Sequence, residues 1–164
     1  MVIAEWANFY VATAGAAAGL TGLLFVAVAL RPAEIRRSSL MAGRARSAFY
    51  AFGAVLLVAL LELAPQPVRW VGLVQAAIPA ATVGLSGRFT LRAARARQIN
   101  YRRAFVYHVG LVAAGVAGLL RVAAFDSAAA TVLAAGVVLL LGVALSNAWQ
   151  LVISHESDVG TDPR

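Results

Sequence analysis

Five long apolar runs, separated by short breaks, dominate this chain of 164 residues. The runs cover about residues 6–30, 48–64, 68–87, 104–125 and 128–153. A helix of about 20 residues, rising ~1.5 Å per residue, crosses the ~30 Å hydrocarbon core of a bilayer. Inside that core only helices and closed barrels satisfy every backbone polar group. The pattern therefore predicts an all-α fold, a polytopic transmembrane helix bundle with five spans.

The composition agrees with a membrane protein. Hydrophobic residues make up 62% of the chain and charged residues 13%, which is far from the balance of a soluble domain. The net charge of +7 alone would suit a nucleic-acid-binding protein, but most arginines lie in two short segments between apolar runs. We therefore expect no nucleic-acid partner. Cysteine is absent, which excludes disulfides, thiolate metal ligands and cysteine nucleophiles.

The breaks between the runs carry residues that end or begin helices. Arg31-Pro32 closes the first run, and Ser38 or Ser39 is the predicted N-cap of a second helix that starts before its apolar part. Pro65-Gln66-Pro67 ends that helix. Asp126-Ser127 is the only polar break between the last two runs. The fourth and fifth spans are therefore predicted to form a tight helical hairpin.

The arginines are unevenly distributed among the connections. Of the 14 arginines, 11 follow the first or the third run: Arg31, Arg36, Arg37, Arg44, Arg46, Arg88, Arg92, Arg95, Arg97, Arg102 and Arg103. Basic residues near the ends of spans resist translocation, so these two connections are predicted to be cytosolic. The N-terminus is then external, residues 1–153 form one transmembrane domain, and residues 154–164 form a short cytosolic tail.

Small residues line one face of the first span and one face of the fourth. Gly15, Gly19 and Gly22 are spaced for the close approach of another helix, as are Gly110 and Gly118. Two interpretations stand. The first stripe joins copies of the chain in a homo-oligomer, or it packs within the chain, with the second stripe as its partner. Packing within the chain is favoured because such motifs recur widely.

Three arginines share one face of a predicted cytosolic continuation of the third span. Arg88, Arg92 and Arg95 are spaced by four and three residues, which places them on the same side of a helix. Anionic lipid headgroups attract such residues by about 1 kcal/mol each. We expect these arginines to contact a lipid bilayer with anionic headgroups at its cytosolic face. A specific acidic ligand or partner protein is the alternative.

Five ionisable residues are predicted near the external ends of the spans: Glu5, Glu62, Arg69, Arg121 and Asp126. Glu62 and Arg121 lie nearest to the hydrocarbon, where an unpaired charge at mid-bilayer costs at least about 2.5 kcal/mol. One interpretation is an ion-pair cluster that clamps the helices together, and the other is a path for protons or ions. The structural interpretation is favoured because the cost falls near the interface, where arginine can also extend towards water.

Signatures of soluble enzymes are missing. Without lysine there is no phosphate-binding P-loop, and His108 and His155 are too far apart for an H-E-x-x-H zinc helix. Gly84-Leu85-Ser86-Gly87 is similar to the G-x-S-G motif of rhomboid intramembrane proteases, with His108 opening the next span. However, Ser86 lies at the C-terminal end of its helix, where the dipole opposes an oxyanion. We expect no catalytic site, metal or cofactor.

Two patches resemble a family of small, largely uncharacterised multi-pass bacterial membrane proteins. They are residues 6–27, which contain Gly15-Ala-Ala-Ala-Gly19, and Asn147-Ala148-Trp149. Some members of that family are labelled as modulators of a membrane AAA protease. The resemblance implies only the multi-span architecture, and it brings no catalytic or binding residues. We expect the chain to lie in the bacterial cytoplasmic (inner) membrane.

The leading functional hypothesis is a non-enzymatic integral membrane protein of structural, regulatory or assembly type. The alternative is a small transporter, or an ion or proton channel, that acts as an oligomer. A conduit needs polar groups through the middle of the bilayer. Here the mid-span positions are nearly all apolar, apart from Gln75 and the backbone at Pro79. This balance favours the first hypothesis.

Overall fold

A computed structural model describes residues 2–65, 67, 69–78 and 101–153 of the chain. These residues are almost entirely helical, and no strand occurs among them. The named helices are α1 (Val2–Leu30), α2 (Pro32–Arg37), α3 (Ser39–Leu63), α5 (Tyr101–Val122) and α6 (Asp126–Ile153). Residues 69–78 form a further helical segment. The predicted all-α fold is confirmed for this part of the chain.

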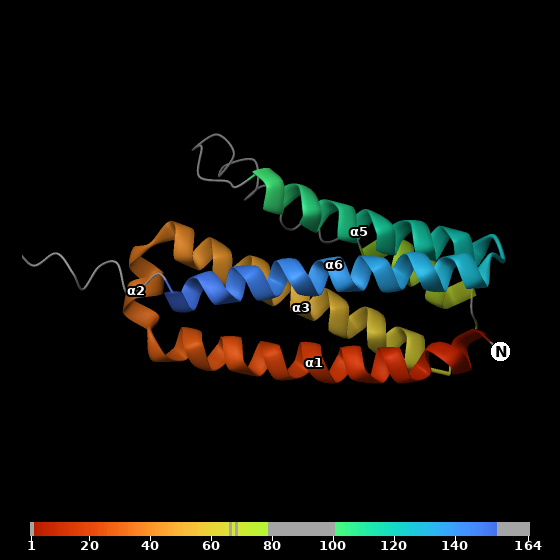
Figure 1. Cartoon of the computed structure of the whole chain (residues 1–164), viewed down its shortest axis with the longest axis horizontal. Helices are drawn as coiled ribbons and strands as arrows, with labels where there is room; N and C mark the ends of the chain where they lie inside the picture. Colours follow the sequence, from red (N-terminus) through yellow and green to blue (C-terminus); the bar gives the residue numbers. More distant parts are fainter. Residues whose placement is uncertain (1, 66, 68, 79–100, 154–164) are drawn as a thin grey trace, which may run out of the picture.

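The four long helices lie side by side; α3 and α5 run from the α2 side towards the opposite end, and α1 and α6 run the other way (Figure 1). α3 packs against α1 and α6, and α6 also packs against α5. The short helix α2 joins α1 to α3 at one end of the bundle (Figure 1). The end of α3 and the turn between α5 and α6 lie at the other end, which we call the turn end. The end that carries α2 is called the α2 end.

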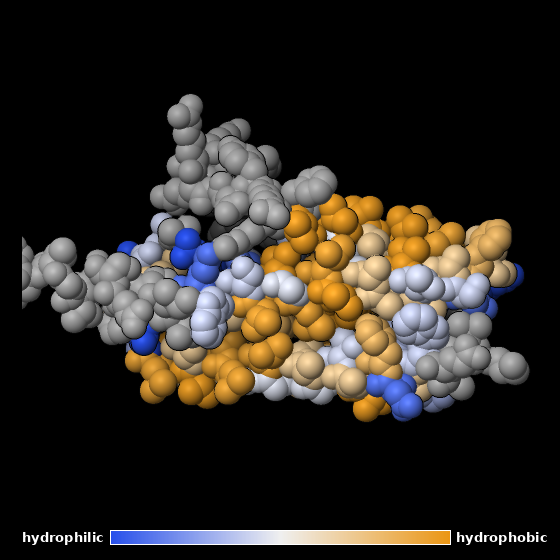
Figure 2. Space-filling model, in the orientation of Figure 1, coloured by the Kyte–Doolittle hydropathy of each residue, from blue (hydrophilic) through white to orange (hydrophobic). Residues whose placement is uncertain are grey.

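Three of the described helices are long and apolar enough to cross a membrane: Trp6–Leu30, Met41–Leu63 and Asp126–Leu151. Residues Val106–Val122 form a shorter apolar helix. Large apolar side chains also cover the exterior, as at Leu23, Leu30 and Leu119. Hydrophilic residues gather towards the two ends of the molecule (Figure 2). This distribution is typical of a protein whose middle contacts lipid rather than water.

The predicted helix ends at the α2 end are confirmed. α1 ends at Leu30, directly before Arg31-Pro32. Ser38 is the N-cap of α3, and its side-chain oxygen accepts a hydrogen bond of 3.3 Å from the backbone N–H of Met41. The short helix α2, which begins at Pro32, was not expected from the sequence. Proline suits the first position of a helix because its missing N–H would be unpaired there in any case.

The break between the last two runs was placed a few residues too late. α5 ends at Val122, and Asp126 begins α6 instead of separating two helices. The backbone N–H of Phe125 donates to the carbonyl of Leu120, and that of Ala124 donates to the carbonyl of Arg121. These bonds make a Schellman motif, with Ala124 in the left-handed conformation at φ 66°. The predicted tight hairpin of α5 and α6 is nevertheless present.

Glycine contacts set the closest approaches between helices. A Cβ atom at Gly118 would lie 2.5 Å from the carbonyl oxygen of Gly72. A Cβ atom at Gly136 of α6 would lie 3.0 Å from the carbonyl oxygen of Gly110. α5 therefore uses one glycine against residues 69–78 and another against α6. Such contacts matter in lipid, where the hydrophobic effect does not drive helices together.

The two predicted glycine stripes do not pack against each other. A Cβ atom at Gly15, Gly19 or Gly22 would meet nothing within 4 Å, so this stripe of α1 lies on the exterior. The expectation of mutual packing is wrong because the glycines of α5 are already occupied by residues 69–78 and by α6. The opposite face of α1 supplies the buried residues, including Tyr10 and Ala17.

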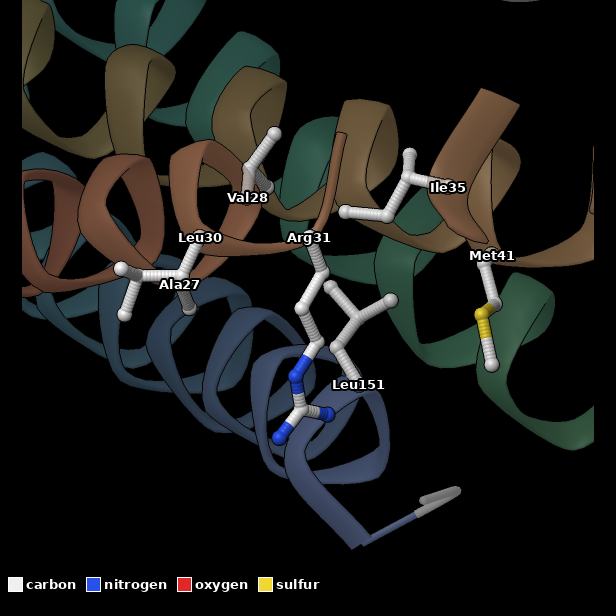
Figure 3. Close-up of a pocket in the computed structure, with 7 residues that line it drawn as sticks. All are labelled: Ala27, Val28, Leu30, Arg31, Ile35, Met41 and Leu151. Carbon is white, nitrogen blue, oxygen red and sulfur yellow. The ribbon is translucent and has the colours of Figure 1, made fainter. Parts of the chain in front are cut away.

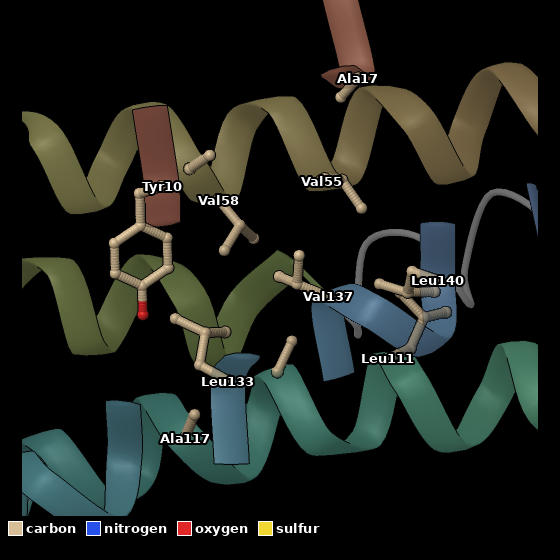
Figure 4. Close-up of a cluster of buried hydrophobic side chains, with 11 residues drawn as sticks. Tyr10, Ala17, Val55, Val58, Leu111, Ala117, Leu133, Val137 and Leu140 are labelled. Carbon is tan, nitrogen blue, oxygen red and sulfur yellow. The ribbon is translucent and has the colours of Figure 1, made fainter. Parts of the chain in front are cut away.

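The core between the helices is built from aliphatic side chains. Val55 and Val58 of α3, Leu111 and Ala117 of α5, and Leu133, Val137 and Leu140 of α6 meet there (Figure 4). A second cluster lies around Phe52 of α3 and Leu151 of α6. In addition, the side-chain amide of Asn147 donates a 3.2 Å hydrogen bond to the hydroxyl of Ser47, which links α6 to α3.

Replacing Gly118 by alanine should destabilise the fold by about 1–3 kcal/mol, because the new methyl group would clash with the backbone at Gly72. Gly142→Ala in α6 is the matched control, since its methyl group would meet nothing within 4 Å. The control should change the stability by less than about 1 kcal/mol, in the stabilising direction. Thermal unfolding in a mild detergent, followed by tryptophan fluorescence, measures both variants. Equal midpoints would contradict the close packing of residues 69–78 on α5.

Candidate functional site

A cluster of buried polar side chains lies at the turn end of the bundle. Glu62 belongs to the last turn of α3, Arg121 to the last turn of α5, and Gln75 to residues 69–78. Their exposed fractions are 3%, 5% and 0%. Because α3 and α5 both finish at this end, side chains far apart in the sequence are brought to the same place. We call Tyr10, Glu62, Gln75 and Arg121 the buried polar cluster.

Glu62 is the centre of this cluster. Its Oε1 atom accepts a hydrogen bond from Arg121 Nη1 at 2.5 Å, which is also an ion pair. The same oxygen accepts a second hydrogen bond from Gln75 Nε2. Charge-assisted hydrogen bonds of this kind are roughly twice as strong as neutral ones. One carboxylate oxygen thus connects α3, α5 and residues 69–78.

Tyr10 closes the cluster from the side of α1. Its ring reaches from α1 into the interior beside α3 (Figure 4), and only 1% of the residue is exposed. The hydroxyl group interacts electrostatically with both Glu62 and Arg121. As a result, each of the chain segments that meet at this end contributes one polar side chain, apart from α6.

Three buried atoms of the cluster have no hydrogen-bond partner among the described residues. They are Oε2 of Glu62, Oε1 of Gln75 and the hydroxyl oxygen of Tyr10. A buried polar group without a partner costs about 1–3 kcal/mol. Two of these atoms are acceptors, and the hydroxyl group of Tyr10 can donate as well as accept. Such a group of unpaired atoms is unusual, since most buried polar groups in proteins are paired.

Two glycines, Gly72 and Gly118, allow the chain segments of the cluster to approach closely. A Cβ atom at Gly72 would lie 3.1 Å from the Cβ atom of Arg121, and one at Gly118 would lie 3.1 Å from the Cβ atom of Gln75. The absence of side chains at these positions thus brings the stems of Gln75 and Arg121 next to each other. The hydrogen bonds to Glu62 depend on this close approach. If α5 and residues 69–78 lay farther apart, Gln75 and Arg121 could not both reach the carboxylate of Glu62.

The predicted polar cluster of five residues is only partly assembled. The structure brings Glu62 and Arg121 together, whereas Arg69 and Asp126 are exposed. The side chain of Glu5 lies outside the described residues. Gln75 and Tyr10 complete the cluster instead. Gln75 was expected as a polar residue within a span, whereas Tyr10 was not among the predicted site residues.

Several other predicted features fall outside the described residues. These are Arg88, Arg92, Arg95, Pro79, the Gly84–Gly87 motif and the tail 154–164. His108 lies in α5. Its ring packs edge to face against the ring of Tyr107, with 5.7 Å between the ring centroids. Within the part of the chain that the structure describes, no group of His, Asp or Glu side chains is arranged to hold a metal ion.

Comparisons with known proteins give no relative. No family model matches the chain, and neither the curated proteins nor the solved structures contain a match. The resemblance to small bacterial membrane proteins therefore stays a prediction, and the residues of the site must be interpreted from their geometry alone.

The geometry of the buried polar cluster is that of a clamp. Two opposite charges face each other, away from water, and a neutral amide donates to the same oxygen. A buried ion pair is weak evidence of added stability, because removing both charges from water costs about as much as the pair gains. Losing one partner, however, leaves an uncompensated charge in a low-dielectric interior. The cluster therefore stabilises one arrangement of the helices against others.

Replacing Glu62 by leucine should destabilise the fold by about 3–5 kcal/mol, because Arg121 would be left buried without its counter-charge. The double variant Glu62→Leu, Arg121→Met removes both charges and should recover much of that loss. Denaturation in mixed detergent micelles gives the free energy of unfolding of Glu62→Leu, of Arg121→Met and of the double variant. Together with the parent protein, these values form a double-mutant cycle.

Arg69→Gln is the control for this cycle, since Arg69 is exposed near the same end. Its effect should stay within about 0.5 kcal/mol. If the Glu62 and Arg121 effects simply add in the double variant, the two side chains are not coupled and the clamp is disproved.

Proposed function

We propose that this chain is a non-enzymatic integral membrane protein of structural, regulatory or assembly type. The observation that carries the proposal is the closed bundle: its charges are paired inside, and its exterior is apolar. In this arrangement the polar cluster holds helices together and is not presented to a substrate. Five spans, an external N-terminus and the bacterial cytoplasmic membrane complete the proposal.

The exterior supports a lipid environment. Leu23 of α1 keeps 69% of its surface exposed, Leu57 of α3 keeps 57%, and Leu119 of α5 keeps 62%. In water, contiguous apolar surface of this extent would cause aggregation or require a partner. In a bilayer the same side chains contact acyl chains at no such cost. The bundle is therefore best understood with hydrocarbon as its solvent.

The charge distribution supports the proposed orientation. Arg31, Arg37, Arg44 and Arg46 all belong to the α2 end of the bundle. Among the described residues, the turn end carries the exposed charges of Arg69 and Asp126. Since arginines near the ends of spans remain in the cytosol, the α2 end faces inward and the N-terminus outward.

The interior favours a structural role over conduction. Between the buried polar cluster and the α2 end, the described core is mainly apolar, with residues such as Val55, Val137 and Leu140, and the hydrogen bond of Asn147 to Ser47 is a single polar link there. A path for ions needs polar groups along its whole length. A homo-oligomer stays part of the proposal, and the outward glycine stripe of α1 is a surface on which copies can meet closely.

Reporter fusions test the architecture. A reporter that is active only in the cytosol should be active when fused after Arg37 and inactive when fused after Ser127, because the first site lies at the α2 end and the second at the turn end. The protein should also stay with membranes after extraction at alkaline pH. Release into the supernatant, or the opposite reporter pattern, would contradict the proposed spans and orientation.

One observation favours the alternative, a proton or ion conductor. Oε2 of Glu62 is buried and without a hydrogen-bond partner among the described residues, as is the neighbouring Tyr10 hydroxyl. An ionisable group inside a span is a functional hypothesis by default. Proton transfer through this site would need an oligomer or a rearrangement, because the surrounding core is apolar.

Flux measurements in liposomes separate the two functions. Under the structural proposal, liposomes that contain the protein should show the same proton leak as empty liposomes when a pH gradient is imposed. Under the alternative, the parent protein should conduct and Glu62→Gln should abolish the flux, since the amide cannot carry the proton. Arg69→Gln is the control and should behave as the parent protein in either case.

A further inference from the structure

A second feature of the bundle lies at the α2 end and is independent of the buried polar cluster. The end of α1, together with α2, α3 and α6, encloses a cavity of about 170 Å³ (Figure 3). Val28, Leu30, Ile35, Met41 and Leu151 contribute apolar walls. Its volume is similar to that of cavities that admit a benzene-sized apolar molecule. It can therefore hold a short section of hydrocarbon chain.

The cavity has one charged wall, which is Arg31. Its side chain extends from the end of α1 towards Leu151 and α6 (Figure 3). The side chain of Glu34 in α2 lies outside the side chains that the structure describes; among those described, the ion pair found joins Glu62 and Arg121, and none involves Arg31. A guanidinium group beside an apolar cavity suits a ligand that is anionic at one end and apolar at the other.

The position of the cavity along the bundle further limits the class of ligand that fits it. Leu30 is the last residue of a membrane-length apolar helix, and Arg31 follows it directly. This boundary is where hydrocarbon gives way to headgroups. Further arginines at the start of α3, Arg44 and Arg46, make the surroundings positive. Charge and polarity thus complement a phospholipid with an anionic headgroup.

We propose that this cavity is a binding site for one anionic phospholipid. Arg31 binds the phosphate, and the upper part of one acyl chain enters the space between α1, α3 and α6. The rest of that chain and the whole of the second chain stay in the bilayer, because the cavity is too small for them. This inference rests on the proposed membrane location, but it does not depend on which side of the membrane the α2 end faces.

Such a site differs from general attraction of headgroups to arginines. The predicted contacts of Arg88, Arg92 and Arg95 need charge alone, whereas this site also requires an apolar wall formed by several helices. Its occupant links the end of α1 to the end of α6. Binding should therefore depend on the shape of the cavity as well as on Arg31.

Native mass spectrometry of the detergent-solubilised full chain tests the proposal. The probes are phosphatidylglycerol and phosphatidylcholine with identical acyl chains. One phosphatidylglycerol molecule should be retained at least about fivefold more tightly, and Arg31→Gln should remove this preference, as expected from about 1 kcal/mol per basic residue near a membrane. Arg37→Gln is the matched control, because Arg37 is exposed and does not line the cavity.

A second pair of variants tests the cavity itself. Ala27→Phe places a ring in the cavity and should weaken phosphatidylglycerol binding about as much as Arg31→Gln, although the charge is retained. Ala29→Phe lies on the same helix but on its exposed face, so it should have no effect. This pair decides the outcome if Arg31→Gln fails to fold, which thermal unfolding would reveal.

Three results would overturn the lipid site. They are equal retention of the two lipids, equal effects of Ala27→Phe and Ala29→Phe, and full competition by glycerol phosphate, which would show that a free phosphate group suffices. These results leave the membrane location untouched, because alkaline extraction tests that proposal separately. A protein that stays in the membrane but shows no lipid preference would refute this site alone.

Discussion

The ion pair of Glu62 and Arg121 is the contact on which the turn end of the bundle depends. Neither side chain is accessible to water, so each charge depends on the other as its counter-charge. Gln75 donates to the same carboxylate oxygen, which fixes residues 69–78 against α3 and α5. This arrangement requires the glycine contact between Gly72 and Gly118, because the backbones must approach closely before these side chains can meet. Close packing and charge pairing therefore stabilise each other.

Local signals in the sequence predicted much of the fold. Arg31-Pro32 and Ser38 set helix ends through backbone chemistry that acts within a few residues, and both ends are where the sequence placed them. The turn between α5 and α6 was placed too late because Ala124 adopts a left-handed conformation that usually requires glycine. No sequence rule indicates alanine at such a position. Its conformation follows from the packing of the hairpin.

The candidate site was harder to predict than the fold. Glu62 and Arg121 stand out because a charge in an apolar run is conspicuous, but the sequence did not show that they pair with each other rather than with Arg69 or Asp126. The contribution of Tyr10 left no signal, since α1 is apolar all round and its buried face cannot be distinguished from its lipid face. Which face of α1 is buried depends on contacts with helices far away in the sequence.

The two ends of the bundle differ in how the charge of an arginine side chain is compensated. At the turn end, Arg121 is buried and its charge is compensated within the chain. At the α2 end, Arg31 borders a cavity with apolar walls, and none of the acidic side chains that the structure describes pairs with it. A charge that is paired inside the fold fixes the helices in any environment, whereas one at the proposed membrane boundary would respond to the lipid that we propose beside it. The stability of this protein is therefore expected to depend on its own side chains at one end and on the composition of the bilayer at the other.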